Sequence, residues 1–226
     1  MKYDSTCEAV FLSRPNRFIA IVDLDGKEER VHVKNTGRLR ELLLPGARVI
    51  LQKGTAPDRK TAYDLISVYK EGLGWVNIDA QATNTAVLEW LRANTPHFPN
   101  ISKIKPEYSF GASRVDFYLE CGSREILMEV KGCTLERDGV GLFPDAPTER
   151  GVKHLRELSA AVSQGYECYL AYVIAMPGVT SVIPNEMTHP QYAAAFREAE
   201  AAGVRTLYLA CDITPDSITI KNDPKA

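Results

Sequence analysis

The sequence predicts an α/β (α+β) protein in which a β-rich first part is followed by a mixed part of helices and strands. Two observations indicate this class. Short apolar runs separated by turns fill residues 1–75, and from residue 83 onward segments with helical apolar spacing alternate with strand-like segments. With 226 residues, of which 45% are hydrophobic and 25% charged, the chain has room for one or two domains with a sizeable core.

Five short strands are expected in the first part, at residues 8–12, 17–24, 29–33, 48–51 and 62–69. Asp25-Gly26 predicts a hairpin turn, Pro45-Gly46 predicts another turn, and Leu39–Leu44 predicts one helical turn. Five such strands suit an OB-like barrel, a fold that often binds oligonucleotides, and a small SH3-like barrel used as a scaffold is the open alternative.

The run Gly72-Leu-Gly74 predicts a domain boundary, which gives a first domain of residues 1–75 and a second of residues 76–226. A helix over residues 83–94 opens the second domain, with Thr83 or Asn84 available to cap it. The segments expected after it are strands at 106–110, 113–120 and 124–131, a helix at 147–164, a strand at 166–175, a helix at 189–202 and a strand at 204–210.

Two carboxylates and an ammonium group fall on two of these strands. Asp116 lies in the middle strand, and Glu129-Val130-Lys131 ends the next one, after the turn Cys121-Gly122-Ser123. Because side chains alternate along a strand, Glu129 and Lys131 share one face, and a hairpin brings Asp116 onto the adjoining strand. Such a group can surround one divalent metal and one phosphate, which suits phosphodiester cleavage.

The acid-x-Lys spacing alone carries little weight, because about one or two such triplets are expected by chance in a chain of this length and composition. The chain has four, and three of them lie in turns rich in Gly, Pro or charge: Asp25-Gly-Lys27, Asp58-Arg-Lys60 and Asp223-Pro-Lys225. Glu129 instead follows Ile126-Leu-Met128, a run typical of a strand covered on both faces. Spacing and burial leave a metal site and a structural Glu–Lys pair as equal alternatives.

Longer blocks of the chain resemble one known family. They are Asn35-Thr-Gly-Arg38, Leu44-Pro-Gly46, Arg59-Lys-Thr61, Gly111-Ala-Ser-Arg-Val-Asp-Phe117, Glu129-Val-Lys-Gly-Cys-Thr-Leu135 and the most distinctive block, Phe143-Pro-Asp-Ala-Pro-Thr-Glu-Arg-Gly-Val-Lys-His-Leu-Arg-Glu-Leu158. From about Arg14 to Gly203 the chain resembles the sugar fermentation stimulation protein A (SfsA) family. The resemblance implies an N-terminal OB-like barrel and a C-terminal PD-(D/E)xK (restriction-endonuclease-like) mixed-sheet domain. The predicted order helix–strand–strand–strand–helix–strand agrees with that core.

The resemblance also implies roles for the charged residues. Asp116 and Glu129 would be the metal ligands, and Lys131 would polarise the attacking water or hold the scissile phosphate. Mg²⁺ (or Mn²⁺) is the expected ion, since carboxylate oxygens and retained waters suit its octahedral shell. Glu89 and Lys153 lie on the two helices that often supply further polar groups in this superfamily, and they are added as catalytic candidates, with a solvated helix face as the alternative.

Two further residues of the most distinctive block are expected to be structural, and the role of a third, His154, stays open. Asp145 and Thr148 are expected to cap the helix and shape the loop before it, and His154, taken alone, is more often a packed or exposed helix residue than a base. The chain departs from the family pattern at Thr83-Asn84, where the family has Pro-Asn, and at His189, where the family has Asp.

Basic residues of the first domain are candidate phosphate contacts. Residues 1–75 hold 13 Lys and Arg against 10 Asp and Glu, a net charge of +3, whereas the rest of the chain has a net charge of −5. The candidates for nucleic-acid binding are Arg14, Arg17, Lys34, Asn35, Arg38, Arg59 and Lys60. Gly37 permits close backbone approach, and Arg38 can bind phosphate through two hydrogen bonds. Phe18 and Tyr63 could stack on bases, although the barrel core is the expected place for Phe18.

Composition narrows the remaining classes. The five cysteines are widely spaced and include no Cys-x-x-Cys pair, so zinc ribbons and thioredoxin chemistry are not expected, and a reducing, cytoplasmic location is. No secretory signal and no apolar run of 18 residues is evident, so no membrane partner is expected, and the sequence carries no signal for an oligomeric state.

The predicted function is a divalent-metal-dependent nuclease, a hydrolase acting on DNA and/or RNA. One alternative is a non-catalytic DNA-binding regulator of sugar metabolism genes, as the family's name suggests. Another is a metal-binding interaction module without hydrolysis. The presence of Asp116, Glu129 and Lys131 together favours catalysis, because a pure binding protein has no need to keep all three.

Overall fold

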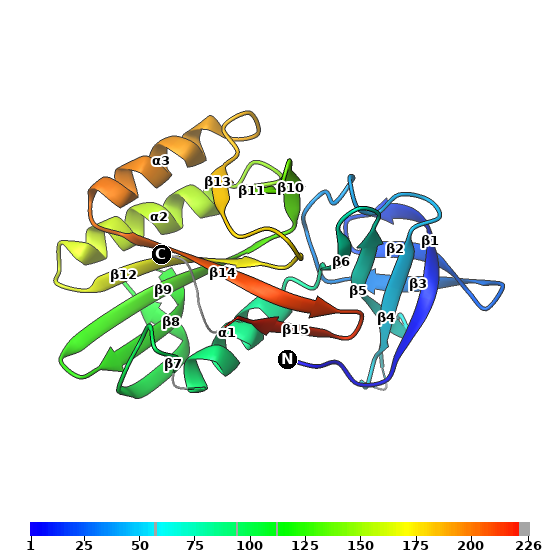
Figure 1. Cartoon of the computed structure of the whole chain (residues 1–226), viewed down its shortest axis with the longest axis horizontal. Coiled ribbons are helices and arrows are strands. Elements are labelled where there is room, and N and C mark those ends of the chain that lie inside the picture. The colour runs from blue at the N-terminus through cyan, green and yellow to red at the C-terminus, as the bar shows by residue number, and fades with distance from the viewer. Residues whose placement is uncertain (57, 94, 112, 222–226) are drawn as a thin grey trace.

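The computed structural model describes residues 1–56, 58–93, 95–111 and 113–221 and consists of a β-barrel beside a mixed-sheet domain (Figure 1). The barrel strands are β1 (Thr6–Asn16), β2 (Ile19–Leu24), β3 (Lys27–Val33), β4 (Arg48–Lys53), β5 (Tyr63–Lys70) and β6 (Gly74–Asn77). They pair in the order β3-β2-β1-β4-β5-β6, and a parallel pairing of β3 with β5 closes the barrel. The prediction of an OB-like barrel followed by a mixed-sheet domain is confirmed.

The barrel follows from its alternating apolar residues and its turns. Val22, Val31 and Leu65 point into the interior and are fully buried. Asp25 and Gly26 both have positive φ, as the predicted two-residue hairpin between β2 and β3 requires. Leu39–Leu44 forms one hydrogen-bonded turn, in which Leu43 N donates to Leu39 O over 2.9 Å.

Two details of the barrel differ from expectation. The strand β6 was not predicted, because its four residues are too few to show a period, and Gly72–Gly74 forms the turn that leads into it. Phe18 was expected in the barrel core, and this is wrong: it lies in the turn between β1 and β2 and is 51% exposed.

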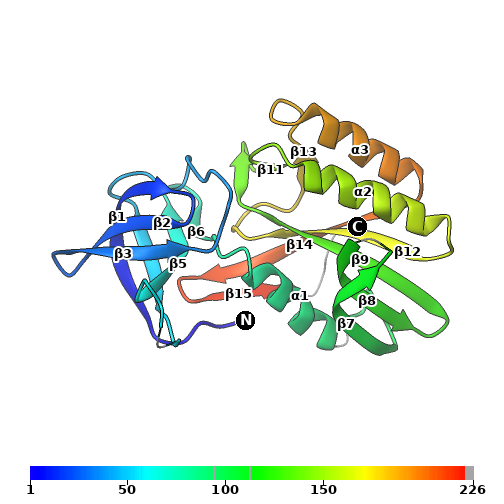
Figure 2. The same ribbon diagram turned by 180° about the vertical axis from the view of Figure 1, so that it is seen from behind.

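The second domain contains three helices and nine strands among the described residues. They are α1 (Ala82–Arg92), β7 (Ile101–Phe110), β8 (Ser113–Cys121), β9 (Arg124–Cys133), β10 (Leu135–Arg137), β11 (Val140–Phe143), α2 (Glu149–Val162), β12 (Glu167–Ile174), β13 (Val182–Pro184), α3 (Pro190–Ala201), β14 (Arg205–Thr214) and β15 (Ser217–Ile220). The main sheet has the order β15-β14-β12-β9-β8-β7, and β10, β11 and β13 form a small second sheet. Helix α1 covers one face of the main sheet, and α2 and α3 cover the other (Figures 1 and 2).

The strand β9 lies inside this sheet, antiparallel to β8 and parallel to β12. As its apolar run predicted, Ile126, Leu127 and Met128 are fully buried on both faces. Leu127 belongs to the core beneath α2, together with Leu155, whereas Ile126 and Met128 belong to the core beneath α1. The Glu129-Val-Lys segment therefore lies on a strand that has a neighbouring strand on each side and a hydrophobic core on each face.

The second domain departs from prediction at the start of its first helix and at its shortest strands. Thr83 and Asn84 do not cap α1: the cap position is Gln81, without a side-chain hydrogen bond, and both residues lie inside the first turn. The predicted end of this helix, Asn94, lies outside the described residues, as does the chain beyond Lys221. The strands β10, β11, β13 and β15 were not predicted, because they are only three or four residues long.

Helix α2 begins as the sequence predicted. Thr148 Oγ1 accepts a hydrogen bond from Gly151 N over 3.0 Å. A side chain at Gly151 would place its Cβ 2.8 Å from Thr148 Cγ2, so the glycine allows the cap to sit close to the helix. The first turn of α2, which carries part of the candidate site, thus has a fixed start.

Several hydrogen bonds join the two domains. Met1 N, at the chain terminus, donates to Ile218 O over 2.8 Å, so the first residues cross from the barrel to β15. Asn77 N donates to Ala175 O over 3.0 Å in the connecting segment. Lys70 Nζ lies 2.6 Å from Glu136 Oε1. These bonds fix the position of the barrel relative to the second domain.

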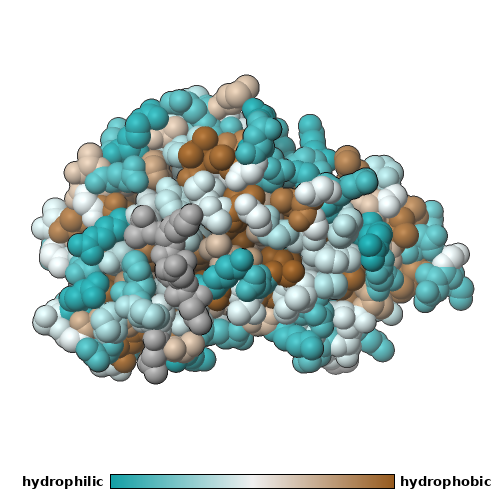
Figure 3. All heavy atoms as spheres, in the orientation of Figure 1, coloured by the Kyte–Doolittle hydropathy of each residue, from teal (hydrophilic) through white to brown (hydrophobic). Residues whose placement is uncertain are grey.

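The molecular surface shows no single large apolar patch on the face seen in Figure 3, where apolar side chains lie at separate places among polar ones. The exposed large hydrophobic residues are Val10, Phe18, Leu44, Tyr69, Ile183 and Met187. None of the helices in the described chain is both long and apolar enough to cross a membrane.

We predict that Thr148→Ala lowers the free energy of unfolding by about 1 kcal/mol, because it removes the acceptor for Gly151 N at the start of α2. Urea denaturation measures the change. Ser159→Ala is the matched control: the Ser159 hydroxyl bonds only to Leu155 O in the same helix, so its loss should have little effect. Equal destabilisation by both substitutions would contradict the assigned cap.

Candidate active site

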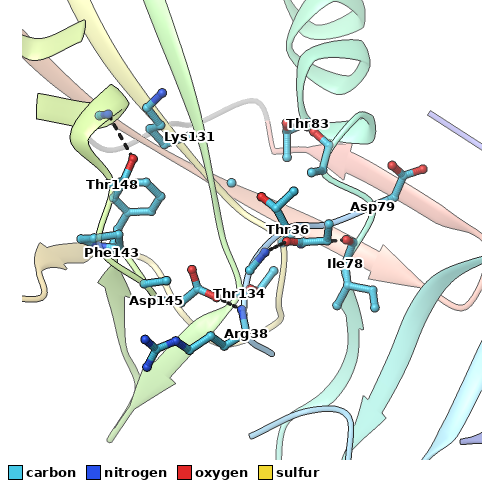
Figure 4. A pocket seen from close by; sticks show the side chains of 18 of the residues that line it. Thr36, Arg38, Ile78, Asp79, Thr83, Lys131, Thr134, Phe143, Asp145 and Thr148 are labelled. Atoms are coloured by element: carbon cyan, nitrogen blue, oxygen red, sulfur yellow. Dashed lines mark hydrogen bonds between the residues drawn. The ribbon is translucent and has the colours of Figure 1, made fainter. Parts of the chain in front are cut away.

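A cleft of about 940 Å³ separates the barrel from the second domain (Figure 4). The β8–β9 end of the main sheet, the first turn of α2, the linker at residues 77–80 and a barrel loop at residues 35–38 contribute to its walls. The charged side chains that line it are Arg14, Arg17, Arg38, Arg40, Asp79, Asp116, Glu129, Lys131, Asp145 and Arg150. The cleft thus brings the predicted carboxylates and part of the predicted basic set to one place.

Asp116 lies where the pairing between β8 and β9 stops. The backbone ladder runs from Cys121↔Arg124 to Phe117↔Met128, and Asp116 is the next residue of β8. Its Oδ2 accepts a hydrogen bond from Val130 N over 2.7 Å, and its Oδ1 accepts one from Asn84 Nδ2 over 2.9 Å. The side chain replaces a backbone partner of β9, which fixes the carboxylate beside Glu129.

Glu129 and Lys131 share one face of β9, as the strand alternation predicted. Glu129 is 3% exposed, and its Oε1 lies 2.5 Å from Lys131 Nζ. Lys131 remains partly exposed, with 17% of its side chain open to solvent. Figure 4 places Lys131 close to the first turn of α2. The ammonium therefore neutralises one of the two carboxylates while still reaching the cleft.

His154 of α2 completes this group. Its Nδ1 contacts Glu129 Oε1, and its Nε2 accepts a hydrogen bond from Arg150 Nε over 3.2 Å. An Nε2 that accepts carries no proton, so this network assigns the proton to Nδ1, which donates to Glu129. His154 is buried, as expected of a packed helix histidine, and it orients the carboxylate of Glu129.

The pKa values of the two carboxylates are shifted in opposite directions. Burial and the nearby charge of Glu129 raise the pKa of Asp116, despite the hydrogen bond from Val130. Burial also pushes the pKa of Glu129 upward, but the hydrogen bond from His154 and the charge of Lys131 outweigh it, and the net shift is downward. Two acids whose environments separate their pKa values in one cleft are typical of a functional site.

The oxygen donors suit a hard divalent cation. Within the described part of the chain, no three or more His, Cys, Asp and Glu side chains form a ready cluster for a metal ion. The cleft instead offers the two carboxylates of Asp116 and Glu129. Mg²⁺ is commonly held by one or two carboxylates and keeps several waters, so this donor set fits Mg²⁺ better than a metal that needs four protein ligands.

Two predicted catalytic candidates lie outside the cleft. Glu89 is on the exposed side of α1, where its carboxylate lies 2.5 Å from the terminal amine of Met1. Lys153 is exposed on α2 and lies 3.6 Å from Glu157, one turn further along the helix. For both residues the structure matches the alternative of a solvated helix face.

Three members of the predicted phosphate-binding set bond within the protein. Four Arg14 hydrogen bonds go to backbone oxygens, among them those of Gly37 and Asn35, so this side chain holds the barrel loop in place. Lys34 Nζ lies 2.6 Å from buried Asp79. Asn35 Nδ2 donates to Ile78 O over 2.9 Å, and its Oδ1 accepts from Gly37 N.

The other four divide between the cleft and the remaining barrel surface. Arg17 and Arg38 are exposed and line the cleft, whereas Arg59 pairs with Asp64 and, like Lys60, does not line it. Gly37 is close to Asp145 of the second domain: a Cβ there would lie 2.5 Å from Asp145 Oδ2. That same oxygen accepts a hydrogen bond from Arg38 N over 2.8 Å (Figure 4).

Sequence reasoning missed several residues of the cleft, among them two arginines and an asparagine. Arg40 follows Arg38 at an interval of two but lacked a distinguishing pattern. Arg150 was discoverable, because it precedes His154 by four residues on a predicted helix, and such pairs are neighbours. Asn84 was singled out only as a possible cap, since its contact with Asp116 joins positions 32 residues apart.

Comparisons with known families match both domains. Residues 12–78 match the family described as SfsA N-terminal OB domain. Residues 81–217 match the family described as Sugar fermentation stimulation protein RE domain. The two matches together cover most of the chain.

Individual relatives agree with these matches. The chain is 54% identical over 218 residues to a sugar fermentation stimulation protein homolog of Desulfitobacterium hafniense (strain Y51), covering 96% of this chain and 94% of that one. It is 47% identical over 223 residues to a homolog of Clostridium beijerinckii, covering 98% and 97%. The solved structure of Pyrococcus furiosus SfsA in complex with Ca²⁺ is similar, with a TM-score of 0.88, 28% identity and coverage of 98% and 95%.

Proposed function

The chain belongs to the sugar fermentation stimulation protein family, and for this member we propose a divalent-metal-dependent nuclease that hydrolyses phosphodiester bonds in DNA and/or RNA. One observation carries the proposal. Asp116 and Glu129 lie beside each other at the floor of a cleft, next to Lys131, and arginines of the barrel line the same cleft. Two acids with one ammonium suit a metal and a phosphate, and the arginines suit further phosphates.

Asp116 and Glu129 would hold Mg²⁺ or Mn²⁺. When bound, the ion would neutralise phosphate charge and lower the pKa of a water molecule that attacks phosphorus. The Ca²⁺ in the Pyrococcus furiosus structure supports the choice of a divalent cation with oxygen ligands. The raised pKa of Asp116 supports it as well: besides burial, the charge of Glu129 contributes to that shift, and a cation held by these residues would offset this charge.

The protein's own groups have separate tasks in the reaction. Lys131 Nζ reaches the cleft and would stabilise the negative charge that grows on the non-bridging phosphate oxygens. His154 fixes the orientation of Glu129, and Asn84 does the same for Asp116. The hydrogen bond from Arg150 keeps the His154 proton on Nδ1, the nitrogen that faces the carboxylate.

The barrel would bind the nucleic-acid backbone through the arginines that line the cleft. Arg17, Arg38 and Arg40 are exposed there, and no ion pair joins any of them to an acid within the described residues. Guanidinium groups bind phosphate through two parallel hydrogen bonds. Because such contacts do not depend on the base, the barrel is proposed to add affinity without sequence selectivity.

A non-catalytic DNA-binding regulator would use the barrel alone. That function leaves the group of Asp116, Glu129 and Lys131 without a role, although placing the buried carboxylate of Glu129 beside the half-buried one of Asp116 is costly. The geometry of the cleft therefore favours hydrolysis over binding without chemistry.

We predict that Asp116→Asn, Glu129→Gln and Lys131→Ala each reduce Mg²⁺-dependent cleavage of nucleic acid by at least about 100-fold, because each removes charge at the reacting phosphate. Cleavage of labelled single- and double-stranded DNA and RNA, with Mg²⁺ or EDTA, measures the effect. Glu89→Gln is the control for the carboxylates, since Glu89 lies outside the cleft and should be dispensable. Full activity of an Asp116→Asn/Glu129→Gln double variant would refute the assignment.

A second prediction concerns the barrel arginines. Replacing Arg17 and Arg38 by alanine should weaken binding to all sequences alike and flatten the plot of log K against log salt by about 0.7 to 0.9 per lost phosphate contact. Fluorescence anisotropy at several salt concentrations measures this slope. Lys60→Ala, on the barrel but outside the cleft, is the control and should leave the slope unchanged. An unchanged slope in the double arginine variant would mean that the barrel is only a scaffold.

A further inference from the structure

Helix α2 carries a second charged surface next to the cleft. An open hollow of about 570 Å³ lies against this helix, and the cations Arg150, Lys153 and Arg156 line it. These residues are three apart, so they follow one another along neighbouring turns, and all three are exposed. They span a rise of about 9 Å along the helix axis.

This cationic row is continuous with the candidate active site. Arg150 lines both the cleft and the hollow, and its Nε bonds to His154, which contacts Glu129. A chain of phosphates that passes the carboxylates would therefore reach Arg150 first, then Lys153 and Arg156. Lys153, which the sequence marked as a catalytic candidate, lies on this path and not in the cleft.

The acids on the same face already have partners. Glu157 accepts a hydrogen bond from Ser113 Oγ over 2.5 Å and lies 3.6 Å from Lys153 Nζ. Glu149 Oε1 lies 3.2 Å from His189 Nε2. Arg156 has no ion-pair partner within the described chain. Three cations and two carboxylates line the hollow, which leaves a positive balance that suits a polyanion.

The size of the cleft bears on which form of nucleic acid enters it. Its volume of about 940 Å³ is near the upper end for pockets that enclose one small ligand, which run from about 300 to 1,000 Å³. One turn of duplex is about 34 Å long and cannot enter such a space. A few nucleotides of a single strand can, and the buried Glu129 lines the cleft.

We infer that a single strand of nucleic acid leaves the cleft along α2, with its phosphates on Arg150, Lys153 and Arg156. This inference rests on the proposed function of the cleft and adds to it a substrate class and a second binding site. A strand longer than the cleft gains contacts that a short strand lacks. The protein should therefore bind and cut long single strands better than strands of a few nucleotides.

The test compares wild type with Lys153→Gln/Arg156→Gln, which leaves Arg150 and the cleft intact. Anisotropy in EDTA, across a range of salt, gives the affinities for single-stranded DNA of about 4 and about 16 nucleotides, the limits of OB-fold site sizes. With the long strand, the variant should lose about 1.4 from the slope of log K against log salt, about 0.7 for each of two phosphate contacts. With the short strand, its slope should equal that of wild type.

Arg92→Gln/Arg197→Gln is the matched control, because it removes the same charge from exposed positions on α1 and α3. An equal loss of slope in this control, an equal loss with the short strand or with duplex, or no binding of any strand by wild type would overturn the inference. Cleavage in Mg²⁺ by the same proteins separates the two proposals. If wild type cuts nothing but the slope difference persists, hydrolysis fails and the α2 site stands.

Discussion

The arrangement of the site depends on two neighbouring carboxylates, buried Glu129 and half-buried Asp116, where the β8–β9 ladder ends. Asp116 takes over the backbone partner that β8 no longer supplies, so its position is set by the sheet itself. Glu129 projects from the neighbouring strand, and its charge raises the pKa of Asp116. Lys131 and His154 hold the Glu129 carboxylate, whereas no ion pair joins Asp116 to a cation within the described residues. The remaining negative charge suits the cation that the proposed function requires.

The two domains contribute different parts of one surface. The second domain supplies the buried acids, and the barrel supplies the arginines that face them across the cleft. Arg14 bonds four backbone oxygens and so stiffens the loop that carries Arg38. Asp145 then ties that loop to the second domain through Arg38 N. The distance between the arginines of this loop and the acids is thus controlled by hydrogen bonds and not only by the linker.

Much of the architecture was predictable, because apolar periodicity and turn residues carry it. The hairpin at Asp25-Gly26, the buried run of β9 and the cap at Thr148 were all visible in the sequence. The four strands of the second domain with three or four residues were not, since so short a segment shows no period. For the site, strand alternation placed Glu129 and Lys131 together, but Glu89 and Lys153 were chosen from the family resemblance and from the helices that carry them. Which side of a helix faces the cleft depends on packing against distant strands, which spacing along the chain does not reveal.

Binding of Mn²⁺ to the protein tests the central claim most directly, because it reports on the acids without requiring a substrate. Calorimetry on wild type, Asp116→Asn, Glu129→Gln and the control Glu89→Gln compares the sites. If Asp116 and Glu129 hold the ion, each of their variants should lose at least about tenfold in Mn²⁺ affinity, while the control should match wild type. A loss of about tenfold is the least expected, because substitution of a residue that only hydrogen-bonds to a metal ligand already costs that much. Equal Mn²⁺ affinity in all four proteins would contradict the account.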